Sequence, residues 1–177
     1  MKFFVVFITG FFSLFYSDIN LYDIELIKQD GGKISMSAFR NKKIIITAFS
    51  TSNPDYGYLK YLGYLHSQYK NLVIIAIPAI DFGGDISDIK QKDIRDSLPE
   101  NIILTKADKV NKKNGNGQQQ LFKWLTNVGE NSHFDVDVKR DDQLYIISES
   151  GVLYAVLHKP LTSEVIEKVL NEPDVKQ

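Results

Sequence analysis

The amino-acid sequence predicts an α/β protein whose central mixed sheet is flanked by helices on both faces. Two apolar, β-branched runs, Ile44–Phe49 and Leu72–Ile77, lack the alternation of a half-exposed strand and are typical of strands covered on both sides. A segment with helical spacing separates them, and the chain closes with a hairpin pattern and another amphipathic helix. The 177 residues, 44% of them hydrophobic, suffice for one domain with a single buried core.

The first half of the chain is expected to begin with an edge hairpin. Residues 23–27 and 33–36 flank Gln-Asp-Gly-Gly at 29–32, where glycine supplies the positive φ of a tight turn. The central strand 44–49 follows, and a helix begins at Pro54 and Asp55. One face of that helix should pack on the strand, with Tyr58, Tyr61, Leu62, Leu65 and Tyr69. The buried strand 72–77 ends at Pro78, and this strand–helix–strand unit predicts a parallel pair with a right-handed crossover.

The second half continues the alternation of helices and strands. Phe-Gly-Gly at 82–84 predicts a turn, the polar segment 85–97 a solvated helix, and 102–104 a short strand. The Asn/Gly/Lys-rich segment 111–117 is expected to be a loop, and a helix around Trp124 is predicted from the spacing of Leu121, Phe122, Leu125 and Val128. Strands 144–147 and 152–156 bracket a Ser-Glu-Ser-Gly turn, and Thr162 is expected to cap a last helix with Val165, Ile166, Val169 and Leu170.

Residues 1–17 differ from the rest of the chain and are expected to be a signal peptide. After Lys2, the uncharged run 3–16 has the length of a secretory signal's apolar core and is shorter than the roughly 20 residues that cross a bilayer as a helix. Ser17 is a suitable residue before the cut, whereas the bulky Phe15 is not. We expect an exported protein, periplasmic or secreted, with no stable membrane span in the mature chain. A hydrophobic extension packed on the domain and an uncleaved anchor are the alternatives.

The composition excludes several classes of function. Lys and Arg total 21 against 22 Asp and Glu, so the chain has no broad electrostatic attraction for nucleic acid, and no nucleic-acid partner is expected. The chain contains no cysteine, which excludes disulfides, thiolate metal sites and thiol nucleophiles. The three histidines lack paired spacing, so we expect no metal, and nothing in the sequence indicates a cofactor.

Three segments, in this order, resemble motifs of the glutathione peroxidase family. Residues 46–53 are similar to N-V-A-S-x-C-G, residues 77–84 to F-P-C-N-Q-F-G-G, and residues 121–125 to L-Y-K-W-L. Upstream, residues 30–33 and 37–42 resemble the family's turn and its S-x-y-x-G-K approach to the first central strand. The resemblance covers 22–170, leaves 171–177 as a tail, and implies a thioredoxin-like fold, which the order of the expected elements also matches.

The resemblance places Ser52 where the family carries its peroxidatic cysteine or selenocysteine. Serine cannot replace either, because its hydroxyl is a far weaker acid than a thiol and has no step equivalent to sulfenic acid. The family's glutamine becomes Asp81, and Arg140 and Asp141 stand at the positions of the tryptophan and asparagine of W-N-F-x-K-F. Carboxylates there would oppose a developing thiolate or selenolate. We therefore expect no catalytic residue at these four positions.

Other chemistry at these positions is less favoured. A hydrolytic Ser52 needs a histidine base, but His66 lies about 21 Å along the helix, and neither of the other histidines has a spacing that points to it. A turn or capping role for Ser52 is therefore expected. Asp81 and the adjacent pair Asp141 and Asp142 could offer carboxylates to a hard cation, but neighbours on a strand point to opposite faces. A salt bridge between Arg140 and Asp81 is expected instead.

The sequence favours a binding or interaction role on a thioredoxin-fold scaffold that lacks thiol peroxidase activity. The alternative is a thiol peroxidase acting in oxidative stress with residual or altered activity. Tyrosines occur all round the helix Tyr56–Tyr69, and surface aromatics are enriched at interfaces, so this helix is the candidate surface for a protein partner, although core packing accounts for part of the pattern. The short stretch 99–118 resembles compact family members without an assembly insertion, which predicts a monomer.

Overall fold

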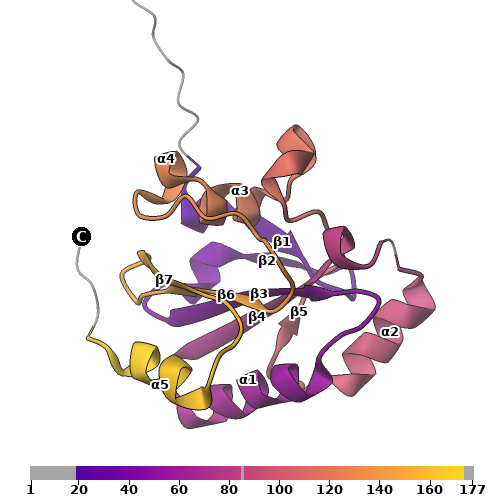
Figure 1. The fold of residues 1–177 in the computed structure, drawn as a ribbon, viewed down its shortest axis with the longest axis horizontal. Helices are drawn as coiled ribbons and strands as arrows, with labels where there is room; N and C mark the ends of the chain where they lie inside the picture. Colours follow the sequence, from indigo (N-terminus) through magenta and orange to yellow (C-terminus); the bar gives the residue numbers. More distant parts are fainter. Residues whose placement is uncertain (1–18, 85, 174–177) are drawn as a thin grey trace, which may run out of the picture.

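The computed structural model describes residues 19–84 and 86–173 and shows two sheets (Figure 1). The strands are β1 (Glu25–Ile27), β2 (Lys33–Ser35), β3 (Lys43–Ser50), β4 (Leu72–Ala79), β5 (Ile103–Leu104), β6 (Gln143–Ile147) and β7 (Leu153–Leu157). The helices are α1 (Tyr56–Gln68), α2 (Asp88–Ser97), α3 (Gln120–Thr126), α4 (Val128–Asn131) and α5 (Ser163–Asn171). Short 3₁₀ helices cover Leu21–Asp23, Met36–Phe39, Ile80–Phe82 and Lys112–Gly117. The expected signal peptide, 1–17, and residues 174–177 of the expected tail lie outside the described residues.

The central sheet is mixed, as the sequence predicts. Its strand order is β5-β4-β3-β6-β7, and β1 and β2 form a separate antiparallel pair. The strands β3, β4 and β5 run parallel to one another. The strand β6 runs antiparallel to β3, and β7 runs antiparallel to β6. The predicted central strand, the parallel unit around α1 and the C-terminal hairpin are therefore confirmed.

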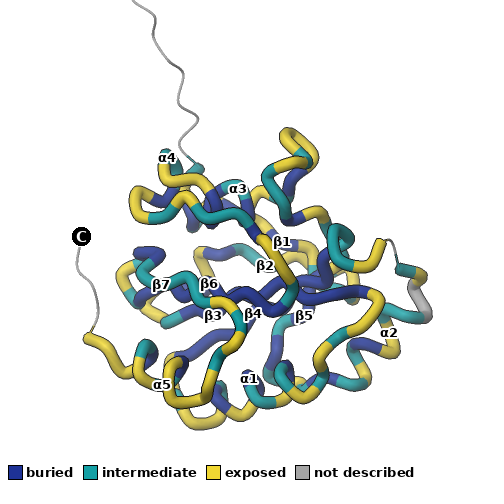
Figure 2. Tube along the Cα trace, viewed as in Figure 1, coloured by how far each residue is buried: buried dark blue, intermediate teal, exposed yellow. Residues whose placement is uncertain are grey.

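Successive residues of a strand point to opposite sides of the sheet, and the central strands are apolar on both sides. Helices therefore cover both faces of this sheet. On β3, Ile44 and Ile46 belong to one core, which α3 and the two N-terminal 3₁₀ helices complete, and Ile45 and Phe49 belong to the other. The second core is closed by α1, α2 and α5, which lie together below the sheet in Figure 1. Figure 2 shows β3 and β4 as almost wholly buried, which explains why neither strand alternates in hydropathy.

The strand β4 continues through Pro78 to Ala79, so the predicted end of this strand at Pro78 is wrong. Pro78 aligns with Phe49 of β3, and its carbonyl accepts a hydrogen bond from the N–H of Asp108, 3.0 Å away. The neighbouring strand β5 already ends at Leu104. Proline is tolerated here because the missing N–H falls beyond the ladder between β4 and β5.

The single helix predicted through Val128 is two helices in the structure. Asn127 has extended backbone angles, and its side chain accepts a hydrogen bond from the N–H of Gly129, so it starts α4 as an N-cap. Thr126 ends α3 with its hydroxyl donating to the carbonyl of Phe122. Val128 is 46% exposed and therefore does not extend the buried face of α3.

The buried face of α1 is aliphatic rather than tyrosine-rich. Leu59, Leu62 and Leu65 are buried, whereas Tyr58 and Tyr61 are half-buried at the border of that face. None of the helices in the described part of the chain has the length and apolar character needed to cross a bilayer. The described helices and strands run from Leu21 to Asn171.

Candidate functional site

Ser52 lies in the loop between β3 and α1 and is exposed. Its hydroxyl oxygen is 3.2 Å from that of Ser50, and the Ser50 hydroxyl donates to the carbonyl of Phe82 at 2.5 Å. Because Ser50 uses its one proton on that carbonyl, Ser52 is the donor in the contact between the two serines. The Ser52 proton is therefore directed at a hydroxyl and not at a general base.

The turn after β4 packs directly against the Ser52 loop. A Cβ on Gly83 would lie 2.4 Å from the Ser52 nitrogen and 2.8 Å from the Ser52 hydroxyl oxygen. The neighbouring Thr51 hydroxyl donates to the carbonyl of Gly84 at 2.9 Å. The Phe-Gly-Gly segment and the Ser52 loop, about thirty residues apart in sequence, therefore form one joined edge, and only glycine at position 83 permits that approach.

The Asp81 side chain is 4% exposed and turned toward the segment 110–114. Its carboxylate accepts hydrogen bonds from the backbone N–H of Val110 at 2.6 Å and of Asn111 at 3.1 Å, and from the Asn114 amide at 3.0 Å. The Lys113 ammonium is 3.7 Å away. Burial opposes ionisation, but these hydrogen bonds and Lys113 hold the pKa of Asp81 below its usual range. Asp81 therefore organises a loop.

The expected salt bridge between Arg140 and Asp81 is wrong. Arg140 is exposed, and its guanidinium donates to the carbonyl of Lys159 at 3.3 Å. Asp81 instead pairs with Lys113, because the turn at 80–82 points its carboxylate toward the loop that follows β5. Asp141 is half-buried in the turn before β6, next to Asp142. The structure thus does not bring the two expected partners together.

A cluster that the sequence did not reveal lies at the same edge of the sheet: Asp55, Tyr58, Asp142 and Lys159. The Lys159 ammonium is 2.8 Å from a carboxylate oxygen of Asp55 and 2.8 Å from one of Asp142. It also lies 4.9 Å from the centre of the Tyr58 ring, within range of a cation–π contact. We call these four residues the Lys159 cluster. Burial raises the pKa of the Tyr58 phenol, so this ring stays neutral.

One signal could have found the Lys159 cluster. Leu144 of β6 pairs with Leu157 of β7 in antiparallel register, so two residues further out Asp142 faces Lys159 across the hairpin. That register depends on the length of the turn, which the sequence predicts. Asp55 offers no such signal, because local spacing identifies it only as the N-cap of α1.

Among the described residues, the two histidines with hydrogen bonds pair with an amide and a backbone carbonyl. The His66 ring lies 3.2 Å from the Asn101 amide, and the His133 ring contacts the carbonyl of Asn131. His158 is exposed after β7. No group of three or more metal-ligating side chains occurs within residues 19–84 and 86–173.

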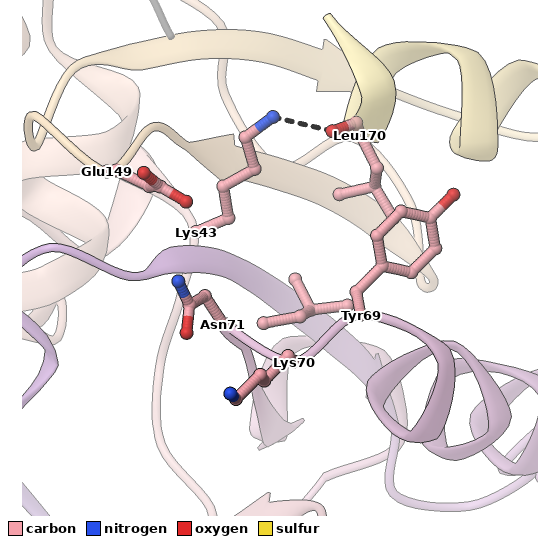
Figure 3. A pocket seen from close by; sticks show the side chains of 7 residues that line it. Lys43, Tyr69, Lys70, Asn71, Glu149 and Leu170 are labelled. Atoms are coloured by element: carbon pink, nitrogen blue, oxygen red, sulfur yellow. Dashed lines mark hydrogen bonds between the residues drawn. The ribbon is translucent and has the colours of Figure 1, made fainter. Parts of the chain in front are cut away.

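A cavity of about 260 Å³ lies at the opposite edge of the sheet (Figure 3). Its lining includes Lys43 at the start of β3, Lys70 and Glu149. The Lys43 ammonium donates to the carbonyls of Leu170 and Glu172, and so satisfies backbone oxygens at the end of α5. Ser52 follows the other end of β3, so this cavity is separate from the edge that carries Ser52.

The fold and motifs agree with the comparisons to known proteins. The structure is similar to that of T. cruzi GPX1, with a TM-score of 0.61 and 15% identity over 85% of this chain and 93% of that one. A thioredoxin-like protein from Aeropyrum pernix gives a TM-score of 0.57 and 14% identity, with 85% and 90% of the two chains covered. A secreted Mycobacterium tuberculosis disulfide oxidoreductase homologous to E. coli DsbE gives 0.55 and 7%, with 83% and 93% covered.

The family assignment rests on sequence. No curated protein sequence matches the chain. At the identities above, the structural likeness supports the thioredoxin-like fold alone. The family model for glutathione peroxidase, however, matches residues 21–126, more than half of the 177 residues. It includes the Ser52 loop, the Phe-Gly-Gly turn and the Trp124 helix, and the chain therefore belongs to the glutathione peroxidase family.

Proposed function

We propose that this member of the glutathione peroxidase family does not reduce peroxides through a sulfur or selenium cycle and serves as a binding or interaction protein. The observation that carries the proposal is the absence of cysteine from all 177 residues, with serine at position 52. Cleavage of an O–O bond in this family needs a thiolate or selenolate that is oxidised and then reduced again. A serine hydroxyl supplies neither the nucleophile nor the oxidised intermediate.

The surroundings of Ser52 support this proposal. Its proton is directed at the Ser50 hydroxyl, so no neighbouring base activates it. Asp81, at the position of the family's glutamine, spends both carboxylate oxygens on residues 110–114. The Phe-Gly-Gly turn thus packs beside position 52, but neither Ser52 nor Asp81 offers a donor prepared for an anionic intermediate there.

The helix α1 is the proposed partner surface. Tyr64 is 54% exposed, and its ring lies 6.4 Å from that of Tyr61, whose hydroxyl donates to Glu167 of α5 at 3.3 Å. Exposed aromatic rings held in place by neighbours contribute strongly to protein interfaces, because little side-chain entropy is lost on binding. We call Tyr61 and Tyr64 the tyrosine surface.

We also propose that the chain is exported as a monomer after cleavage at residue 17. The apolar run 3–16 supports export, and one structural neighbour is a secreted protein. Mass spectrometry of the exported protein should give an N-terminus at Asp18, and sedimentation should give one chain per particle. An intact Met1 in the exported fraction, or a dimer at micromolar concentration, would contradict this part of the proposal.

The loss of peroxidase activity is tested by comparing three proteins: the native chain, Ser52→Cys and the control Ser67→Cys. Ser67 is exposed on α1, about 17 Å from the start of that helix. We expect the native chain to be inactive with a thiol reductant. The Ser52→Cys variant should consume peroxide at a rate within about tenfold of that of Ser67→Cys, since no hydrogen bond prepared for a thiolate is present at position 52. Rapid turnover by the native chain would support the peroxidase alternative, and rapid turnover by Ser52→Cys alone would show that the reaction pocket survives.

The interaction role is tested with Tyr64→Ser, which removes the most exposed ring of the tyrosine surface. Proteins captured by the native chain from the exported fraction should be lost with this variant and kept with Lys168→Met, a change to an exposed residue of α5. If Tyr64→Ser captures the same proteins as Lys168→Met and the native chain, the tyrosine surface is excluded as the binding site.

A further inference from the structure

Lys159 connects three segments of the chain at the edge that carries Ser52. Asp55 begins α1, Asp142 lies just before β6, and Lys159 itself follows β7. The Lys159 ammonium is 2.8 Å from a carboxylate oxygen of each aspartate. One cation therefore holds the start of the helix, the turn into β6 and the link to α5 together.

The two carboxylates in this cluster differ in their surroundings. The Asp55 side chain is 47% exposed and also accepts the backbone N–H of Tyr58 at 3.0 Å. The Asp142 side chain is 3% exposed, and its second carboxylate oxygen is buried without a hydrogen-bond partner in the described part of the chain. An ionised carboxylate that is buried and half unsatisfied is costly, so Asp142 gains most from taking up a proton.

We propose that Lys159 is an acid-sensitive latch, which bridges Asp55 and Asp142 when both are ionised and pairs with Asp55 alone once Asp142 is protonated. The proton comes from solvent and neutralises the Asp142 carboxylate. Lys159 keeps its charge and its contact with Asp55 throughout. This inference goes beyond the proposed function, because it depends neither on peroxide chemistry nor on a partner.

The electrostatics of the cluster give the order of protonation. Burial raises the pKa of Asp142 despite the hydrogen bond from Lys159, and the charge of Asp141 adds to this increase. The hydrogen bond from Lys159 lowers the pKa of Asp55. As pH falls, Asp142 therefore becomes neutral while Asp55 is still charged.

The other groups at this edge keep their charge state over the same range. Burial opposes the charge of Lys159, but its hydrogen bonds to Asp142 and Asp55 outweigh this and raise its pKa. The Tyr58 phenol stays neutral because burial raises its pKa. The Arg140 guanidinium donates a hydrogen bond to the Lys159 carbonyl at the same edge.

The sign for stability follows from these directions. The raised pKa of Asp142 means that its ionised form weakens the fold at neutral pH, and this cost disappears as pH falls through that pKa. The lowered pKa of Asp55 means that its contribution is present above the ordinary value of 3.8 and is lost only below it. Between the two pKa values, Lys159 has one ionic partner.

The test measures both pairings against pH in the full chain. Carboxyl ¹³C NMR of the unmodified protein gives the titration midpoint of each aspartate. Urea unfolding of Asp142→Asn, Lys159→Met, Asp55→Asn and the corresponding double variants gives the coupling of each aspartate to Lys159. Asp142→Asn combined with Lys168→Met serves as the control. This pair should show no coupling, because Lys168 is an exposed residue of α5 and is not part of the Lys159 cluster.

We expect Asp142 to titrate above 3.8 and Asp55 below it. The Asp142–Lys159 coupling should change the unfolding equilibrium on the order of tenfold at pH 7 and disappear with the Asp142 midpoint, while the Asp55–Lys159 coupling persists. An Asp142 midpoint below that of Asp55, or two couplings that vanish together, would overturn the proposal. The NMR titration decides this order even where a variant does not fold.

Discussion

Gly83 is where the turn after β4 meets the Ser52 loop, and alanine at this position should destabilise the protein. An added Cβ would lie 2.4 Å from the Ser52 nitrogen and 2.5 Å from the Thr51 hydroxyl oxygen, and the φ of 151° is one that L-residues rarely adopt. The backbone conformation costs about 1–3 kcal/mol for a residue with a side chain. The forced displacement of packed atoms costs about 1–3 kcal/mol more. Gly83→Ala should therefore lower the free energy of unfolding by about 2–6 kcal/mol.

Urea unfolding followed by the fluorescence of the buried Trp124 measures this loss. With a slope of about 2 kcal/mol per molar urea, the midpoint should fall by about 1–3 M. Gly84→Ala is the matched control: φ is +79°, but no atom lies within 4 Å of the added Cβ, so backbone strain alone should cost about 1–2 kcal/mol. A loss for Gly83→Ala no larger than for Gly84→Ala would refute the close contact between turn and loop.

Three further predictions concern other parts of the molecule. Asp81→Asn should lower the free energy of unfolding, measured with urea at pH 7, by about 1–3 kcal/mol. Because the pKa of Asp81 is lowered in the folded protein, the native chain should lose this extra stability as pH falls below the ordinary value of 3.8. A difference between the two proteins that does not change with pH would contradict this prediction. Asn131→Ala should lower the thermal midpoint, at a cost of about 1–3 kcal/mol, because the buried amide donates to the carbonyls of Trp124 and Phe134; an unchanged midpoint would be inconsistent with those bonds. Tyr64→Ser should change the free energy of unfolding by less than about 0.5 kcal/mol, and a larger loss would mean that this ring belongs to the core.

Much of the fold follows from local patterns. Uninterrupted apolar runs identify β3 and β4 as covered strands, and Asp55 and Thr162 cap their helices where their spacing predicts. Local patterns fail where a tertiary contact decides the outcome. Pro78 stays in β4 because the neighbouring strand β5 has already ended at Leu104. Asn127 separates α3 from α4 because its side chain caps α4.

The candidate site is less predictable from sequence than the fold. The absence of cysteine is a property of composition and needs no structure. The partner of Asp81, in contrast, depends on the path of the loop 110–114, which no local spacing encodes. Lys159 lies beside Asp142 through strand register and beside Asp55 through the packing of α1, so only the assembled fold brings the three together.

The number of peroxide molecules that each chain consumes in the presence of excess thiol shows whether the protein turns over peroxide at all. The 177-residue chain has two sulfur atoms, in Met1 and Met36, and only that of Met36 remains after the proposed cleavage at residue 17. Methionine sulfoxide is not reduced without a dedicated enzyme. We predict that consumption above the protein-free rate stops at no more than 2 peroxide molecules per chain, one for each methionine. Sustained consumption of many molecules per chain by metal-free protein would show that peroxide turnover survives without cysteine and would contradict the account.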